Sequence, residues 1–172
     1  VIRRSALREA EKWMVDRTRH SDGLGAIYPA MMYFIMALEC LGYPRDHPDL
    51  VEAIRVYEDL MTDSAERLYF QPCFSPVWDT AIAMFALGEQ GHEAAEAQRR
   101  AADWLIAKEI RRRGDWSVKR PETEPSGWAF EFNNEHYPDI DDTAMVLLGL
   151  QHAKASDPAA QERWEQRALT WL

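Results

Sequence analysis

The sequence predicts an all-α protein built from repeated helix pairs, arranged as a partial α/α toroid or as an open solenoid. Apolar residues recur at gaps of three and four along most of the chain, which is typical of amphipathic helices. A six-residue pattern with tryptophan at its fifth position also recurs without gaps, at Glu9–Met14, Arg100–Leu105 and Arg167–Leu172. Repeated helix pairs must stack on their neighbours to bury their apolar faces.

Seven helices are expected from this spacing. In the first, Ala6, Ala10, Trp13 and Met14 share one face. The second is apolar on most of its surface, which indicates burial, and Pro44 follows its end. The expected ranges are 5–15, 30–41, 48–62, 79–87, 93–109, 142–150 and 160–172. The tryptophans of the repeats, and also Trp116, are interpreted as packing residues.

Two segments lack a helical pattern. Residues 63–78 hold Pro72 and Pro76 among many aromatic side chains, which predicts an ordered, partly buried connection. Residues 114–138 form a long aromatic loop, in which Gly127–Phe132 alternates aromatic with smaller or polar residues. A long ordered loop within a compact domain is usually functional.

Composition restricts the function. The 172 residues carry a formal net charge of −9, which argues against nucleic acid as a partner. Cys40 and Cys73 have neither metal-ligand spacing nor a disulfide framework, which fits a reducing compartment. The aromatic side chains, seven Trp, six Tyr and six Phe, either pack the core or line a cavity that stabilises positive charge.

Three carboxylates, Asp139, Asp141 and Asp142, lie within four residues at the start of an expected helix. Like charges this close repel, so we expect one proton to be retained. The positive end of the helix dipole stabilises the conjugate base. These properties suit a general acid. The alternative is that these residues merely cap the helix, as Asp often does.

These residues carry a family resemblance. The chain resembles the squalene–hopene cyclases, the bacterial class II triterpene cyclases. The matching segments are the Asp-x-Asp-Asp-Thr-Ala signature at Asp139–Ala144, the aromatic segment Gly127–Asn134, the motif Ser75–Thr80, and a Gln–Trp (QW) repeat at Arg100–Trp116 in which Glu109 stands where glutamine is expected.

The resemblance implies an isomerase of hopanoid biosynthesis that cyclises squalene to hopene inside α/α-barrel domains. Residues 1–70 would end one barrel domain, and residues 71–172 would begin the catalytic one. Asp141 would protonate a terminal alkene, while Asp139 and Asp142 would tune the acid. Neither a metal nor another cofactor is implied. The substrate-binding residues implied are Trp78, Phe130, Trp128 and Tyr28, although Trp128 fits core packing equally well.

The resemblance also implies partners and a location. It implies squalene or a similar polyprenoid as the substrate, and peripheral attachment to the cytoplasmic side of a bacterial cell membrane. It is also compatible with a homodimer of the full-length enzyme. Neither His136 nor His152 matches the family histidine that supports the acid. We therefore expect an internal segment of the enzyme that is inactive alone.

Two alternative functions remain. The chain could belong to a class II cyclase that acts on another polyprenoid, such as a diterpenoid precursor. It could also be a non-catalytic helical-repeat binding module whose acidic loop is a solvated cap.

Overall fold

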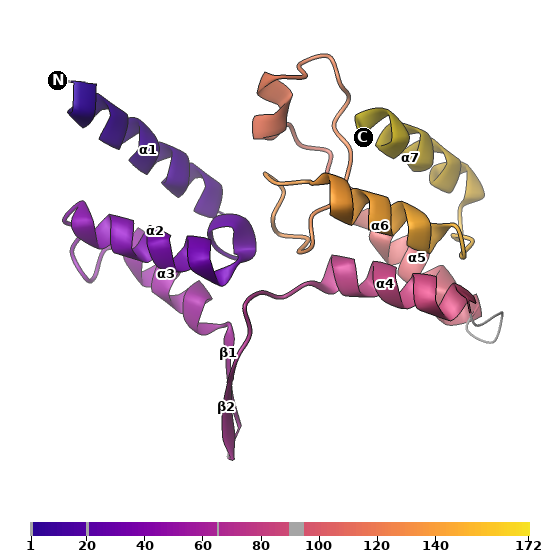
Figure 1. The fold of residues 1–172 in the computed structure, drawn as a ribbon, viewed down its shortest axis with the longest axis horizontal. Helices are drawn as coiled ribbons and strands as arrows, with labels where there is room; N and C mark the ends of the chain where they lie inside the picture. Colours follow the sequence, from indigo (N-terminus) through magenta and orange to yellow (C-terminus); the bar gives the residue numbers. More distant parts are fainter. Residues whose placement is uncertain (1, 20, 65, 90–94) are drawn as a thin grey trace. The chain divides into compact units, whose positions relative to one another are not determined.

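Helices make up most of the chain, as the sequence predicts (Figure 1). The computed structural model describes residues 2–19, 21–64, 66–89 and 95–172. The chain divides into two units, Val1–Phe74 and Ser75–Leu172, each with its own core. The sequence predicted no strand, but the first unit contains a two-stranded antiparallel hairpin.

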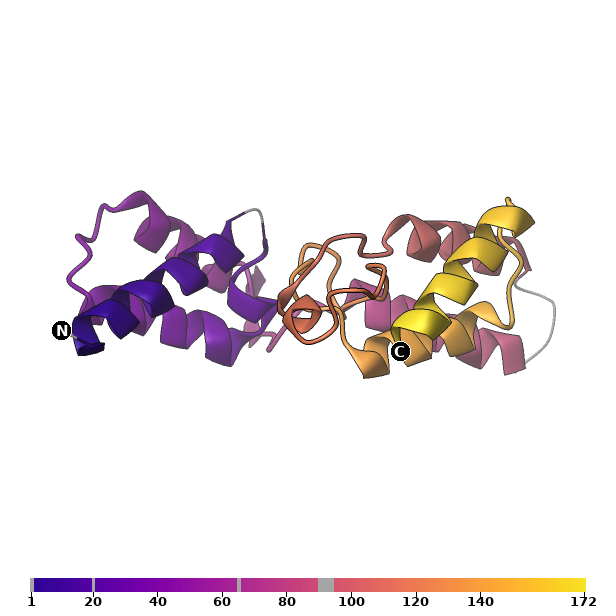
Figure 2. The ribbon, with the colours of Figure 1, turned by 90° about the horizontal axis from the view of Figure 1, so that it is seen from above.

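The first unit packs three helices beside one another (Figure 2). They are α1 (Ile2–Thr18), α2 (Tyr28–Cys40) and α3 (Pro48–Glu58). Pro29 and Pro48 lie in the first turns of α2 and α3, where a missing backbone N–H costs no helical hydrogen bond. One core cluster joins the three helices and consists of Val15, Phe34, Leu38, Leu50 and Ala53. The predicted burial of α2 holds for Met31, Phe34 and Leu38, whereas Tyr33 and Met36 are exposed.

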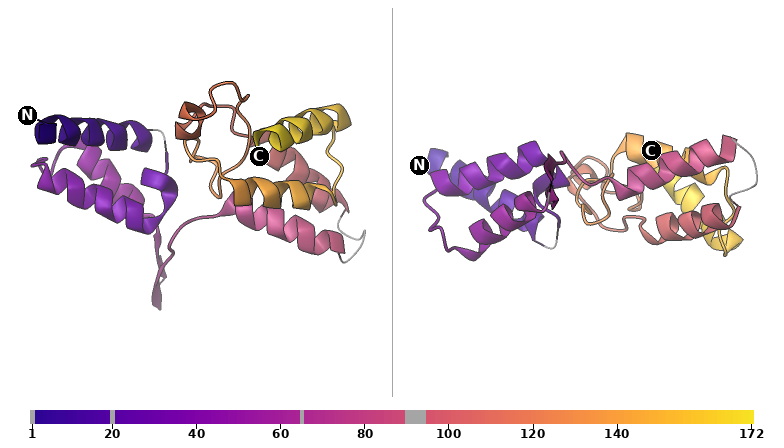
Figure 3. Two further views of the ribbon diagram at one scale, coloured as in Figure 1. Left: turned by 45° about the horizontal axis from the view of Figure 1, so that its top comes forward. Right: turned by 90° about the horizontal axis from the view of Figure 1, so that it is seen from below.

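The hairpin consists of β1 (Met61–Ser64) and β2 (Arg67–Phe70) and extends from the helices of its unit (Figure 3). Met61 pairs with Phe70 and Ser64 with Arg67. The predicted helix through residue 62 is therefore wrong at its end, because α3 stops at Glu58. Every residue of both strands is exposed, so the predicted partial burial of residues 63–78 holds only after the hairpin, where Cys73 is half-buried and Val77 is buried.

The described part of the second unit contains four α-helices around one core. They are α4 (Pro76–Glu89), α5 (Ala95–Ala107), α6 (Ile140–Leu150) and α7 (Pro158–Trp171). The start predicted for the fifth helix, residues 93 and 94, lies outside the described residues. Asp79 lies in the first turn of α4, where its carboxylate accepts a hydrogen bond from Ser75 at 3.1 Å. The fully buried side chains of this core include Trp128, Trp164, Leu105, Val146 and Leu150.

Helices α4 and α6 lie side by side and approach closely through small residues (Figure 3). A Cβ atom at Gly149 would lie only 2.7 Å from the carbonyl oxygen of Ala81, a residue that is itself fully buried. The two backbones could not pack this closely if a side chain were present at residue 149.

The connection between α5 and α6 is mostly irregular. It contains a 3-10 turn at Asp115–Val118, and an isolated β-bridge joins Trp128 to Asp139. In the part of the chain that the structure describes, no helix is both long and apolar enough to cross a bilayer.

Candidate active site

The aspartate cluster lies at the start of α6. Asp139 is the N-cap residue, with extended backbone angles, and its Oδ1 accepts a hydrogen bond from the backbone N–H of Asp142 at 2.8 Å. Asp141 is exposed in the first turn, whereas Asp142 is buried and only 5% exposed. Because a cap must accept from the free N–H groups of the first turn, the capping geometry itself brings Asp139 against Asp142.

A set of backbone contacts fixes the cap. The N–H of Asp139 donates to the carbonyl of Trp128 at 3.0 Å, and the N–H of Trp128 donates to the hydroxyl of Thr143 at 3.0 Å. That hydroxyl in turn donates to the carbonyl of Asp139 at 2.6 Å. The indole N–H of Trp128 reaches the carbonyl of Leu105 at 2.7 Å. The loop, the end of α5 and the start of α6 are thus held together by Trp128.

Gly127 allows the loop to lie this close to α6. Its φ of 101° lies in the region that side chains disfavour. A Cβ atom there would lie 2.9 Å from the hydroxyl of Thr143 and 3.2 Å from the ring of Trp171. Any other residue at this position would therefore push Trp128 away from Asp139.

The pKa values of two of the aspartates are raised. Burial raises the pKa of Asp142 to about 8, and a hydrogen bond with Asp139 together with the charges of Asp139 and Asp141 adds to the effect. Burial also raises the pKa of Asp139, although its hydrogen bonds with Asp142 oppose the shift. A hydrogen bond from the backbone of Phe130 favours the ionised form of Asp142. The Asp139–Asp142 pair therefore shares one proton at neutral pH, as close carboxylates do.

A cavity of about 740 Å³ opens beside this pair. Asp139 and Asp141 line it, together with the indole rings of Trp116 and Trp171, which meet edge to face with centroids 5.7 Å apart. Its other lining residues are Arg120, Thr123, Pro138, Ile140, Thr170 and Leu172. A volume in the range of about 300–1,000 Å³ is usual for a ligand pocket.

The two tryptophans were interpreted from the sequence only as packing residues. They do pack on each other, but they also line the cavity beside Asp139 and Asp141. Their place in the repeat predicts a helical environment but does not reveal which loop will lie opposite.

The other predicted site residues lie in three different environments. The N–H of Val77 donates to the carbonyl of Phe130 at 3.1 Å, which joins the start of α4, next to Trp78, to the loop before α6. Trp78 and Phe130 are both half-buried. Trp128 is fully buried and packs edge to face on Trp164 at 5.5 Å. Tyr28 belongs to the first unit, where its ring packs on Phe70.

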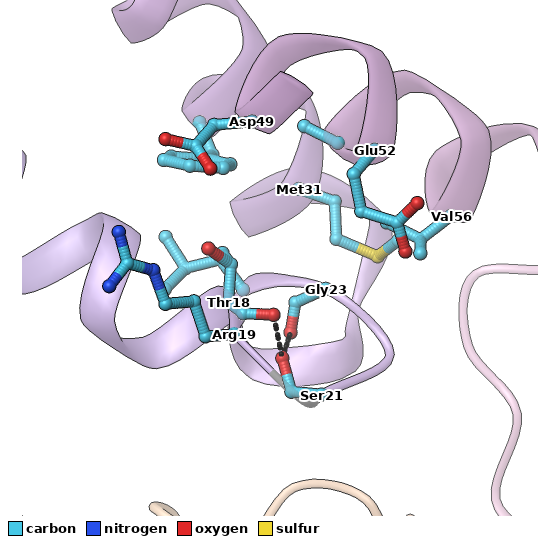
Figure 4. Close-up of a pocket in the computed structure, with 11 residues that line it drawn as sticks. Thr18, Arg19, Ser21, Gly23, Met31, Asp49, Glu52 and Val56 are labelled. Atoms are coloured by element: carbon cyan, nitrogen blue, oxygen red, sulfur yellow. Dashed lines mark hydrogen bonds between the residues drawn. The ribbon is translucent and has the colours of Figure 1, made fainter.

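A second cavity, of about 240 Å³, lies within the first unit (Figure 4). Met31, Phe34 and Val56 contribute apolar surface, while Asp49 and Glu52 of α3 lie at its edge. A hydrogen bond from Arg55 lowers the pKa of Glu52, so that acid is ionised. The raised carboxyl pKa values described above, by contrast, belong to Asp139 and Asp142 of the second unit. Among the described residues, no three His, Cys, Asp or Glu side chains are placed to hold a metal ion.

Two family models match the chain. The model of the squalene-hopene cyclase N-terminal domain covers residues 1–66, and that of the squalene-hopene cyclase C-terminal domain covers residues 74–172. The chain belongs to the squalene–hopene cyclase family. The region of this chain that matches the C-terminal domain includes helices α4 to α7 and all three aspartates of the cluster.

Individual relatives agree with this family. The squalene–hopene cyclase of Zymomonas mobilis is 40% identical over 99% of this chain and 27% of its own length. That of Bradyrhizobium diazoefficiens is 40% identical over 89% of this chain and 24% of its own length. Dammaradiene synthase of Dryopteris crassirhizoma is 35% identical over 96% of this chain and 24% of its own length. The chain thus spans about a quarter of the length of these relatives.

Proposed function

We propose that this chain is the acid-bearing part of a class II triterpene cyclase, an isomerase that converts squalene to hopene through carbocations. The observation that carries the proposal is the aspartate cluster. Asp141 faces a cavity and lies next to a buried pair, Asp139 and Asp142, that retains a proton. This arrangement is that of a general acid beside a space for its substrate.

Asp141 is the proton donor in this proposal. The proton retained in the cluster is delivered through the Asp141 carboxyl to a terminal alkene of the substrate, where the π electrons form the new C–H bond and leave a tertiary carbocation, while the electrons of the broken O–H bond stay on the carboxylate. Later alkenes attack that cation in turn, and loss of a proton ends the sequence. Asp139 interacts with both Asp141 and Asp142, so it links the donor to the retained proton. The dipole of α6 stabilises the carboxylate left on Asp141.

Aromatic faces are assigned to the carbocations that follow. Trp78 and Phe130 are the candidates in the second unit, and Tyr28 is the candidate in the first, because an aromatic ring attracts a cation over its face. Trp128 is assigned a supporting role, since its fully buried ring packs on Trp164.

The architecture and the location of the complete enzyme belong to the same proposal. Residues 1–70 end one α/α-barrel domain, and residues 71–172 begin the catalytic toroid. The enzyme attaches peripherally to the cytoplasmic side of a bacterial membrane, in which squalene dissolves, and forms a homodimer. Membership of the family supports these assignments.

A cyclisation product other than hopene is the second candidate. The 35% identity with dammaradiene synthase favours it, because that relative is named for a different product. Another polyprenoid substrate, such as a diterpenoid precursor, is the remaining alternative. Mass spectrometry of the products formed from squalene and from a diterpenoid precursor distinguishes these candidates. A purely structural acidic cap is less well supported, since it leaves the burial of Asp142 without a purpose.

The test is Asp141→Asn in the intact protein that carries this chain. We expect squalene turnover to fall by about 10²–10⁴-fold, the usual contribution of a general acid. The matched control is Asp157→Asn, an exposed N-cap aspartate of α7, which should leave turnover unchanged. Circular dichroism establishes that both variants fold. Near-normal turnover in Asp141→Asn would rule out this residue as the donor.

The isolated chain provides a second test. We expect no cyclisation from residues 1–172 alone, because the chain lacks a match to the family histidine that supports the acid. Detectable hopene from the isolated chain would contradict the idea that its site is incomplete.

A further inference from the structure

Glu109 is a buried carboxylate outside the aspartate cluster, with a side chain only 6% exposed. It accepts two hydrogen bonds from the guanidinium of Arg167, one of them from Nε at 3.1 Å. It also accepts one from the hydroxyl of Ser126 at 2.6 Å, and Arg111 lies 3.3 Å away. A buried carboxylate needs such charged partners to remain ionised.

This environment explains why glutamate replaces the glutamine expected in the repeat. Only a carboxylate presents two oxygen atoms to the two N–H groups of one guanidinium. A glutamine would turn its own NH₂ group toward an N–H of Arg167 in either orientation, because Arg167 donates to both oxygen atoms of Glu109. The departure from the family pattern is therefore matched to Arg167.

Glu109 is connected to the aspartate cluster through a short stretch of backbone. Ser126 is fully buried and immediately precedes Gly127, whose carbonyl accepts from the N–H of Ile110 at 2.9 Å. The next residue, Trp128, pairs with Asp139. Glu109 thus holds one end of the segment whose other end holds the cap of α6.

We propose that Glu109 is a positioning residue for the aspartate cluster, acting through Ser126 and the Gly127–Trp128 backbone. It does not touch the reacting atoms, and its importance for cyclisation rests on the proposed function. The charge on Glu109 fixes Arg167 of α7 and Ser126 of the loop at one point. As a result, the loop stays pressed against α6 and the Asp139–Asp142 pair stays buried.

The test uses three variants of the intact protein that carries this chain and NMR titration of the Asp142 carboxyl. Glu109→Gln removes the charge, and Ser126→Ala cuts the link to the loop without changing any charge. Glu162→Gln is the control, because Glu162 carries the same charge and lies on α7 like Arg167, but is exposed. We expect both test variants to lower the pKa of Asp142 by at least about one unit, a tenfold loss of proton affinity.

Hydrogen exchange of the Trp128 amide is the second readout. It should become at least about tenfold faster in Glu109→Gln and Ser126→Ala, because the local opening that exposes the amide becomes more frequent. The control should change neither measurement. If the Asp142 pKa and the exchange rate in both test variants equal those of the control, Glu109 only stabilises the fold and the proposal is wrong. Since neither readout depends on turnover, a failed cyclase assay would leave this result intact.

Discussion

Helices α6 and α7 begin in the same way but in different surroundings. Asp139 caps α6 and Asp157 caps α7, and in each case the carboxylate accepts from backbone N–H groups of the first turn. Asp157 is 63% exposed, and its other near neighbour is the exposed Arg163 at 3.8 Å. Asp139 instead lies under the loop that contains Trp128.

The third residue of each helix accounts for much of the difference. In α7 it is Ala160, which brings no charge to the cap, whereas in α6 it is Asp142. Burial under the loop then makes two ionised carboxylates unfavourable, so a proton is retained. A capping aspartate comes to share a retained proton when a second carboxylate lies beside it and a loop shields both carboxylates from water.

The largest expected effect comes from removing the Trp128 side chain, which belongs to the loop over the Asp139–Asp142 pair. Trp128→Ala should lower the free energy of unfolding of the second unit by about 3–5 kcal/mol, the usual cost of deleting a buried tryptophan ring. The Asp142 pKa should fall toward its ordinary value, because water reaches the carboxyl. Urea denaturation followed by circular dichroism measures the first effect, and NMR titration measures the second.

Trp13→Ala is the control for this variant, because that ring is 41% exposed. We expect a change within about 1 kcal/mol, as for most exposed sites. An equal loss of stability in the two variants would mean that burial of Trp128 does not set the difference between α6 and α7.

The second prediction concerns pH. The pKa of Asp142 is about 8 in the folded chain and 3.8 ordinarily, so the folded state binds its proton more tightly. The stabilisation of the fold that results from this tighter proton binding by Asp142 is complete below about pH 4, and it is lost as pH rises toward about pH 8. The slope is at most about 1.4 kcal/mol per pH unit. Asp142→Asn should flatten this part of the profile, and Asp157→Asn should not, which urea titrations across the range will show.

The smallest expected effect separates the two caps. Asp139→Ala and Asp157→Ala should each cost about 0.5–2 kcal/mol near pH 6 through loss of the cap. Above about pH 9 the cost of Asp139→Ala should shrink, because the change then also removes repulsion with ionised Asp142. Thermal unfolding at the two pH values measures both. The same pH dependence in the two variants would contradict a coupling specific to α6.

Local sequence signals predicted α6 well. The run 144–150 is apolar and Asp139 is a favourable cap, and both features depend on residues close in the chain. The clustering of the three aspartates is local for the same reason. By contrast, the burial of Asp142 depends on Trp128 and Phe130, which lie in the irregular segment before α6.

Features that depend on distant contacts were not predicted. The helical pattern of residues 48–62 continues past Glu58, but Leu60 accepts from Gln71 at 2.9 Å and the chain turns into the hairpin instead. Likewise, Glu109 differs from the family pattern for a reason that lies 58 positions away, at Arg167. A pairing over such a distance leaves no periodic signal in one sequence.

The contact between Gly149 and Ala81 has a mechanical consequence for the position of the aspartate cluster. It lies ten residues from Asp139, or about 15 Å along the helix axis. With α6 held against α4 at that point, a tilt of the helix there would move the aspartate cluster at its other end. A larger residue at position 149 that tilted α6 by about 5° would move the cap by about 1 Å, a displacement large enough to misalign a proton donor.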